Sequence, residues 1–248
     1  MKYLKAVLVG LTQGLTEFLP VSSSGHLALL ARLGVCPTSV FYNLALHLAT
    51  LAALLIVMRR EVKGLFLHPV KGETKYVLLA SLPTVAIALL VKWLFPELLA
   101  GRLLGFGFLL TATALFACER FAKPSEKPLD AKISFLTGLA QGVAVLPGVS
   151  RSGLTIATAR LGGVDAERAA KFSFLLSVPV ILGGFLLEGA ETGFSAAGAD
   201  GLEIVAAGIA AFLSGLFAVK FMLRKTKKGL MPFVPYVFVL GIACYFLP

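Results

Sequence analysis

Residues 10–34 read GLTQGLTEFLPVSSSGHLALLARLG. This stretch is an apolar run that is broken near its middle by a proline, three serines and a glycine. A helix needs about 20 apolar residues to cross the hydrocarbon core of a bilayer, and neither half of the stretch is that long. The pattern therefore predicts two short helices joined by a polar turn, which together form a re-entrant hairpin.

The same pattern returns 128 residues later. Residues 138–162 read GLAQGVAVLPGVSRSGLTIATARLG, and 12 of the 25 aligned positions are identical without a gap. Shared apolar composition explains a few of these matches, but it does not explain the aligned Gln, Gly, Ser and Arg. We therefore predict an internal repeat, with halves at about 1–121 and 133–248 in a single membrane domain that covers 1–248.

The composition of the whole chain agrees with a membrane protein. Of 248 residues, 58% are hydrophobic and only 15% are charged, whereas an average soluble domain has about 45–50% and about 25%. The net charge of +10 comes largely from basic residues that flank apolar runs, where they orient helices and meet anionic lipid, so nucleic acid is excluded as a partner. The three cysteines lack metal-site spacing, and we expect them to be packing residues.

Six unbroken apolar runs are long enough to span the membrane. The short loops 59–75, 119–132 and 223–229 are rich in Lys and Arg, which places them in the cytoplasm. The two broken regions, 3–35 and 133–164, then enter the membrane from opposite faces. Lys2 and Lys5 argue against this scheme, because it puts them outside. The predicted spans are 41–58, 76–95, 102–121, 172–188, 202–222 and 230–247.

The predicted fold is thus an all-α integral membrane protein with six transmembrane helices, two re-entrant helical hairpins and an inverted-topology repeat. In such folds the broken helices of the two halves meet near the bilayer midplane and form the functional site. Glycines four residues apart, Gly10 with Gly14 and Gly138 with Gly142, are typical of close helix packing in lipid.

Glu17 is the first candidate for chemistry, because an ionisable group inside an apolar run is costly and by default functional. Gln13 lies four residues earlier, on the same helix face. Ser22, Ser23 and Ser24 follow Pro20, at the start of the second short helix. One of these serines is expected to cap that helix, and the others are available to a ligand.

Ser150, Arg151 and Ser152 occupy the corresponding turn of the second hairpin. Free backbone N–H groups, serine hydroxyls and a guanidinium favour an anion, and the planar fork of arginine fits phosphate oxygens. His26 lies one turn into its helix beside the first serine cluster, so a nucleophile, a base and a phosphate clamp are predicted to meet there. His47 is interpreted as an ordinary interhelical hydrogen-bond donor, and His68 as a loop residue.

QGLTEFLPVSSSGH at 13–26 and PGVSRSGLT at 147–155 resemble the two signature motifs of the bacterial undecaprenyl-diphosphate phosphatases, the bacitracin-resistance type of membrane phosphatase. The FSFLLSVP stretch at 172–179 extends the resemblance over nearly the whole chain. The family has Glu or Gln at the position of Gln13. Since this chain has Gln there, only Glu17 supplies a carboxylate in the first motif.

The resemblance implies hydrolysis of undecaprenyl diphosphate to undecaprenyl phosphate and inorganic phosphate, which recycles the lipid carrier for peptidoglycan synthesis. It implies that the enzyme works at the outer face of the bacterial cytoplasmic membrane. It also implies a divalent cation, Mg²⁺ or Ca²⁺, with Glu17 as a ligand. A homodimer stays open. The implied catalytic residues are Glu17, Ser23, His26 and Arg151. The implied substrate-binding residues are Gln13, Ser22, Ser24, Ser150, Ser152 and Thr155.

Three nucleophiles stay open at this point. Ser23 activated by His26 is our first hypothesis, and direct attack by His26 or by water are the alternatives. A transporter or flippase of polyprenyl phosphate is the rival class, because inverted repeats with broken helices describe it equally well. The enzyme is favoured because hydroxyl, imidazole, carboxylate and guanidinium groups are clustered in the same hairpins, whereas a carrier needs only the donors.

Overall fold

The computed structural model describes residues 1–36, 39–123, 125, 127–192 and 200–246. These residues form an all-helical protein, and no strand longer than an isolated bridge occurs among them. The helices are α1 Lys2–Phe18, α2 Ser23–Arg32, α3 Val40–Val57, α4 Arg59–Leu67, α5 Thr74–Leu94, α6 Pro96–Leu99, α7 Leu104–Phe121, α8 Ala131–Val143, α9 Arg151–Leu161, α10 Ala166–Thr192, α11 Gly201–Lys225, the 3₁₀ helix η1 Thr226–Lys228 and α12 Phe233–Ala243.

Five helices are long and apolar enough to cross a membrane, namely α3, α5, α7, α10 and α11 with η1. They coincide with five of the six predicted spans. The sixth predicted span, 230–247, contains the 11-residue helix α12, which at 1.5 Å per residue is shorter than the ~30 Å hydrocarbon core. By length and composition the structure therefore contains five membrane-capable helices, one fewer than predicted.

Both broken regions form a pair of short helices, as the sequence predicts. In the first region α1 ends at Phe18 and α2 begins at Ser23, and in the second α8 ends at Val143 and α9 begins at Arg151. The two turns are closed by the same hydrogen bonds. Ser22 Oγ accepts from the Gly25 amide and Ser150 Oγ accepts from the Gly153 amide, so one serine of each cluster is a helix cap.

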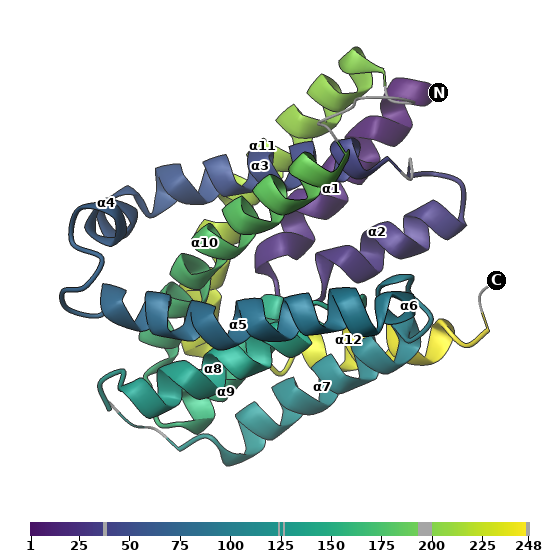
Figure 1. The fold of residues 1–248 in the computed structure, drawn as a ribbon. Coiled ribbons are helices and arrows are strands. Elements are labelled where there is room, and N and C mark those ends of the chain that lie inside the picture. Colours follow the sequence, from purple (N-terminus) through teal and green to yellow (C-terminus); the bar gives the residue numbers. More distant parts are fainter. Residues whose placement is uncertain (37–38, 124, 126, 193–199, 247–248) are drawn as a thin grey trace.

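Each hairpin packs its first helix against a long helix from the other half of the chain. Figure 1 shows α1 beside α11 and α8 beside α5, which are both extensive contacts. A Cβ atom on Gly10 would lie 2.1 Å from the Ala207 carbonyl oxygen, and one on Gly138 would lie 2.1 Å from that of Ala80. The predicted glycine packing is therefore present, because only glycine permits this approach of two backbones.

The main core lies where the hairpins meet the long helices. Phe18 at the end of α1 packs edge-on against Phe174 of α10, with ring centroids 5.4 Å apart, and both side chains are fully buried. The cysteines Cys36, Cys118 and Cys244 are buried in the protein, as expected for packing residues. This packing holds the two polar turns at the same place in the molecule.

Candidate active site

A cavity of about 340 Å³ lies where the turns of the two hairpins meet. Its walls come from both hairpins and from α3, α5 and α10. Of the ten residues predicted for the site, six line this cavity. They are Glu17, Ser22, Ser23, Ser24, Ser150 and Arg151.

Glu17 is the centre of a group of polar side chains at the cavity. Its Oε1 accepts a hydrogen bond from Arg151 Nη2 at 2.5 Å, and its Oε2 accepts from Ser23 Oγ at 2.6 Å. Gln13 Nε2 donates to the same Oε2 at 3.0 Å, and His47 Nε2 lies 3.6 Å from it. The carboxylate is buried, with 6% of its side chain exposed. The hydrogen bond from Ser23 places the carboxylate where it can accept the proton of that hydroxyl, and the guanidinium keeps the carboxylate ionised.

Ser23 and Arg151 occupy equivalent positions in the two hairpins, 128 residues apart. Each is the first residue of the second short helix of its hairpin, so the positive ends of α2 and α9 both lie at the cavity. The repeat thus places a hydroxyl and a guanidinium on either side of one carboxylate. This arrangement fits a phosphate group bound between Ser23 and Arg151.

Three buried polar atoms of cavity residues have no hydrogen-bond partner among the described residues. They are Arg151 Nη1, Asn43 Oδ1 and Gln141 Oε1. Buried polar atoms are nearly always paired in proteins, so each of these three is available to a ligand or to an ordered water. A guanidinium N–H is a donor for a phosphate oxygen, and the two amide oxygens accept a hydrogen bond or coordinate a hard cation.

His26 does not take the place that the sequence predicted for it. Its Nδ1 lies 2.7 Å from the Ser22 carbonyl oxygen, and its Nε2 lies 2.7 Å from the Tyr236 hydroxyl on α12. A carbonyl only accepts, so Nδ1 carries the hydrogen and Nε2 accepts from Tyr236. The ring also packs edge-on against Phe108. His26 therefore holds the backbone of the first turn and is not among the residues that line the cavity.

Gln13, Ser152 and Thr155 also lie outside the cavity lining. Gln13 contacts Glu17 from within α1. Ser152 Oγ donates to the Leu19 carbonyl oxygen at 3.0 Å and so ties the second hairpin to the first. Thr155 Oγ1 donates to the Arg151 carbonyl oxygen at 2.8 Å within α9. The direct contacts of these three residues are with protein groups.

The residues that the sequence analysis missed come mainly from α3. His47 Nδ1 bonds to the Asn43 carbonyl oxygen of its own helix at 2.8 Å, and its Nε2 faces Glu17 of α1, so its contact with another helix is with the carboxylate of the site. Asn43 and His47 are four residues apart, which places them on one face of a helix. That spacing is a signal for a shared polar face, although it does not indicate that the face meets Glu17.

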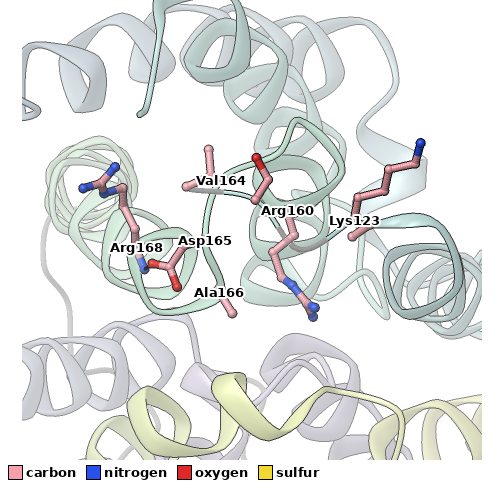
Figure 2. A pocket seen from close by; sticks show the side chains of 8 residues that line it. Lys123, Arg160, Val164, Asp165, Ala166 and Arg168 are labelled. Atoms are coloured by element: carbon pink, nitrogen blue, oxygen red, sulfur yellow. Dashed lines mark hydrogen bonds between the residues drawn. The ribbon is translucent and has the colours of Figure 1, made fainter. Parts of the chain in front are cut away.

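A larger cavity of about 510 Å³ lies elsewhere, between the segment after α7 and the start of α10 (Figure 2). Lys123, Arg160 and Arg168 give it a basic lining. Arg160 forms an ion pair with Glu119, and Arg168 lies 3.4 Å from a Glu73 carboxylate oxygen. Two of the three basic residues of this larger cavity are already paired, and none of the predicted site residues lines it. The smaller cavity is therefore the better candidate for chemistry.

Comparison with known families agrees with this geometry. Residues 6–243 match the family model described as "Bacitracin resistance protein BacA", so the match includes both hairpins. The chain belongs to the BacA family. The motifs that carried the resemblance in the sequence are the same turns that meet at the cavity.

Curated relatives in the BacA family are similar over nearly their full length. An undecaprenyl-diphosphatase of Carboxydothermus hydrogenoformans is 42% identical in an alignment 252 residues long, which covers 98% of this chain and 96% of the relative. An undecaprenyl-diphosphatase of Parabacteroides distasonis is 39% identical over the whole of both chains. One of Korarchaeum cryptofilum is 35% identical over 98% of each.

Proposed function

We propose that the protein is an undecaprenyl-diphosphate phosphatase, a membrane hydrolase that releases the terminal phosphate of undecaprenyl diphosphate and leaves undecaprenyl phosphate. This activity recycles the lipid carrier for cell-wall synthesis and opposes bacitracin. The observation that carries the proposal is the contact of Arg151 and Ser23 with one buried carboxylate, Glu17, at the cavity between the hairpins.

Arg151 and Ser23 have separate tasks in this reaction. Phosphoryl transfer depends on positioning and on neutralising charge. Arg151 Nη1, which has no partner among the described residues, donates to a phosphate oxygen while Nη2 stays on Glu17. Ser23 Oγ attacks the terminal phosphorus and its proton passes to Glu17 Oε2. The bond from that phosphorus to the bridging oxygen breaks, and the electron pair leaves with undecaprenyl phosphate.

Water completes the reaction. It attacks the phosphoserine phosphorus, Ser23 Oγ leaves and regains a proton from Glu17, and the water oxygen and its two protons are released in dihydrogen phosphate. Direct attack by water on the diphosphate, with Ser23 positioning it, is the remaining alternative. Attack by His26 is disfavoured because the Nε2 lone pair of His26 accepts from Tyr236. Glu17 takes the role of base that the sequence analysis gave to His26.

We infer a divalent cation, Mg²⁺ or Ca²⁺, from the chemistry of the oxygen donors that line this cavity. Asn43 Oδ1 and Gln141 Oε1 are buried without partners among the described residues, and with Glu17 and the diphosphate they offer the oxygen ligands that these ions prefer. No cluster of three or more His, Cys, Asp or Glu side chains suited to a metal occurs in the described part of the chain. When bound, the cation neutralises diphosphate charge.

The topology proposed from the sequence is supported by helix lengths and contacts. The helices α2, α8 and α9 have 10, 13 and 11 residues, which is too short to span, and α1 with 17 residues is at the lower limit of about 17–25. Lys2, which the scheme places outside, has its Nζ 3.1 Å from an Asp200 carboxylate oxygen. This hydrogen bond lowers the pKa of the Asp200 carboxyl, so the charge of Lys2 is paired there. The exchange of helix partners, α1 with α11 at Gly10 and α8 with α5 at Gly138, supports two inverted halves.

The position of the cavity supports a site that faces outside. Its wall residues lie near the start of α3 and near the ends of α5 and α10, for example Asn43, Ala88 and Glu188. The basic loops put the opposite ends of these helices in the cytoplasm. The location is therefore the outer leaflet side of the bacterial cytoplasmic membrane. Assembly into a homodimer stays a prediction.

The proposal is tested by release of inorganic phosphate from undecaprenyl diphosphate by the purified protein in detergent, with Mg²⁺ or Ca²⁺ and with a chelator. We expect release with the cation and a strong reduction with the chelator. A protein that binds the lipid but releases no phosphate under either condition is a carrier, and the hydrolase proposal is then wrong. The hydrogen bond from Ser23 to Glu17 favours the hydrolase, because transport needs no activated hydroxyl.

A further inference from the structure

The active-site cavity is lined by both polar and apolar residues. Three polar side chains of α5, α8 and α10 also line it, Thr84, Gln141 and Glu188, and six half-buried apolar residues of α5, α10 and the turn after α8 complete these walls. These are Ala88, Val145, Val180, Ile181, Gly184 and Phe185. A cavity with both kinds of lining fits an amphiphile, whose charged head lies at the polar residues around Glu17 and whose chain lies along the apolar residues.

The internal repeat explains how one cavity acquires two kinds of wall. Thr16 and Glu17 of α1 line this cavity. Their counterparts 128 residues later, Ala144 and Val145, also line the cavity. Equivalent backbone positions therefore carry a carboxylate in one half and an aliphatic side chain in the other.

Gly184 leaves space in the apolar wall. A Cβ atom built on Gly184 has no atom of the described residues within 4 Å, and the same holds for its neighbour Gly183. Glycine in a helix costs about 1 kcal/mol relative to alanine, so neither glycine is favoured by helix formation. Only Gly184 of the two lines the cavity, which Ala88 of α5 also lines, so we take the gap between α10 and α5 to lie between these two residues.

We propose that the prenyl chain of the substrate leaves the head-group site through this gap, between Ala88 of α5 and Gly184 of α10. The inference rests on the proposed function. A volume of about 340 Å³ is at the lower end of the ~300–1,000 Å³ that holds drug-sized ligands. The cavity therefore holds the diphosphate and the first prenyl units, and the rest of the chain lies in the lipid.

An ion pair bounds the gap on its outer side. Lys92 Nζ of α5 lies 2.7 Å from a Glu191 carboxylate oxygen of α10. Lys92 comes four residues after Ala88, about 6 Å along the helix. The pair joins the two helices beyond the cavity, so a chain that passes beside Gly184 emerges on the membrane side of it.

The test is to fill the gap and compare head-group binding with use of the lipid. Gly184→Leu places a side chain in the gap, where its Cβ atom has open space, and Gly183→Leu is the matched control on the same helix. Each variant is purified in detergent, and its KM for undecaprenyl diphosphate and the inhibition constant of inorganic diphosphate are measured. Ala88→Leu fills the gap from the other wall if Gly184→Leu does not fold.

We expect Gly184→Leu to raise the KM for undecaprenyl diphosphate about tenfold while inhibition by inorganic diphosphate stays unchanged, and Gly183→Leu to keep the wild-type KM. The inference is overturned if Gly184→Leu and Ala88→Leu both keep the wild-type KM, or if inhibition by inorganic diphosphate weakens in parallel. Absence of phosphate release by the wild-type protein contradicts the proposed function instead, so the two failures are distinguishable.

Discussion

Arg151 and Glu17 are 134 residues apart in the sequence, and Arg151 Nη2 donates to Glu17 Oε1 at 2.5 Å. The pair connects the second hairpin to the first, and both side chains are largely buried. A buried ion pair contributes little net stability, because desolvation offsets the attraction. Its value here is that it fixes the guanidinium and the carboxylate beside Ser23, where a phosphate group fits.

Ser23→Ala is expected to lower kcat at least 10³-fold and to abolish a phosphorylated enzyme intermediate, because the attacking oxygen is removed. The intermediate is sought by rapid acid quench with substrate labelled in the terminal phosphate, followed by mapping of the labelled peptide. Ser81→Ala is the control, since the Ser81 hydroxyl only donates to the Val77 carbonyl of its own helix.

Label on Ser23 in the wild-type protein supports the covalent route. If repeated quenching at short times finds no label while Ser23→Ala stays inactive, water attacks directly and Ser23 positions it. Label on His26 contradicts the geometry described above.

The two histidines near the hairpins are expected to respond differently to substitution. His47→Leu removes the nitrogen that faces Glu17 and should lower kcat about 100-fold, whereas His47→Gln keeps a polar group there and should lose about fivefold or less. His26 acts by holding the Ser22 carbonyl and Tyr236. Its replacement by Gln should reduce kcat but keep the shape of the pH–rate profile.

Tyr236→Phe removes one of the two contacts of His26 and should give a smaller reduction of the same kind. A pH–rate profile that loses one limb in His26→Gln would show that His26 titrates in the reaction, contrary to its position in the structure.

Gly10→Leu tests the helix contact that holds the first hairpin in place. The new side chain would overlap the Ala207 carbonyl, and overpacking of this kind costs about 1–3 kcal/mol or more. We expect a lower midpoint of thermal unfolding in detergent. Gly208→Leu on α11 is the control, because no described atom lies within 4 Å of its Cβ position. Equal midpoints for the two variants would mean that α1 and α11 are not packed as described.

Much of the fold is predictable from the sequence because hydrophobic runs and broken runs differ in length. The repeat of residues 10–34 at 138–162 predicts both hairpins, and the serine caps of α2 and α9 follow from their composition. The number of spans is less predictable. The run 230–247 is apolar throughout, but hydropathy does not indicate where a helix ends, and α12 ends at Ala243.

The site was predictable where its residues share a hairpin and less so where they depend on distant helices. Glu17, Ser23 and Arg151 meet as expected. The direction of the His26 ring depends on Tyr236, 210 residues away, and the approach of His47 to Glu17 depends on how α3 packs. Ser22 has a φ of 68°, a left-handed conformation that is uncommon for serine and that no sequence pattern indicates.

Arg151→Ala tests the central claim most directly, through phosphate release from undecaprenyl diphosphate by the purified variant. Arg168→Ala is the matched control, because Arg168 is partly exposed and pairs with Glu73 outside the cavity. We predict that Arg151→Ala lowers kcat/KM about 10³-fold or more, as expected for an arginine that neutralises transferring phosphate, and that Arg168→Ala stays within about twofold of wild type. Near wild-type hydrolysis by a folded Arg151→Ala protein would contradict the account.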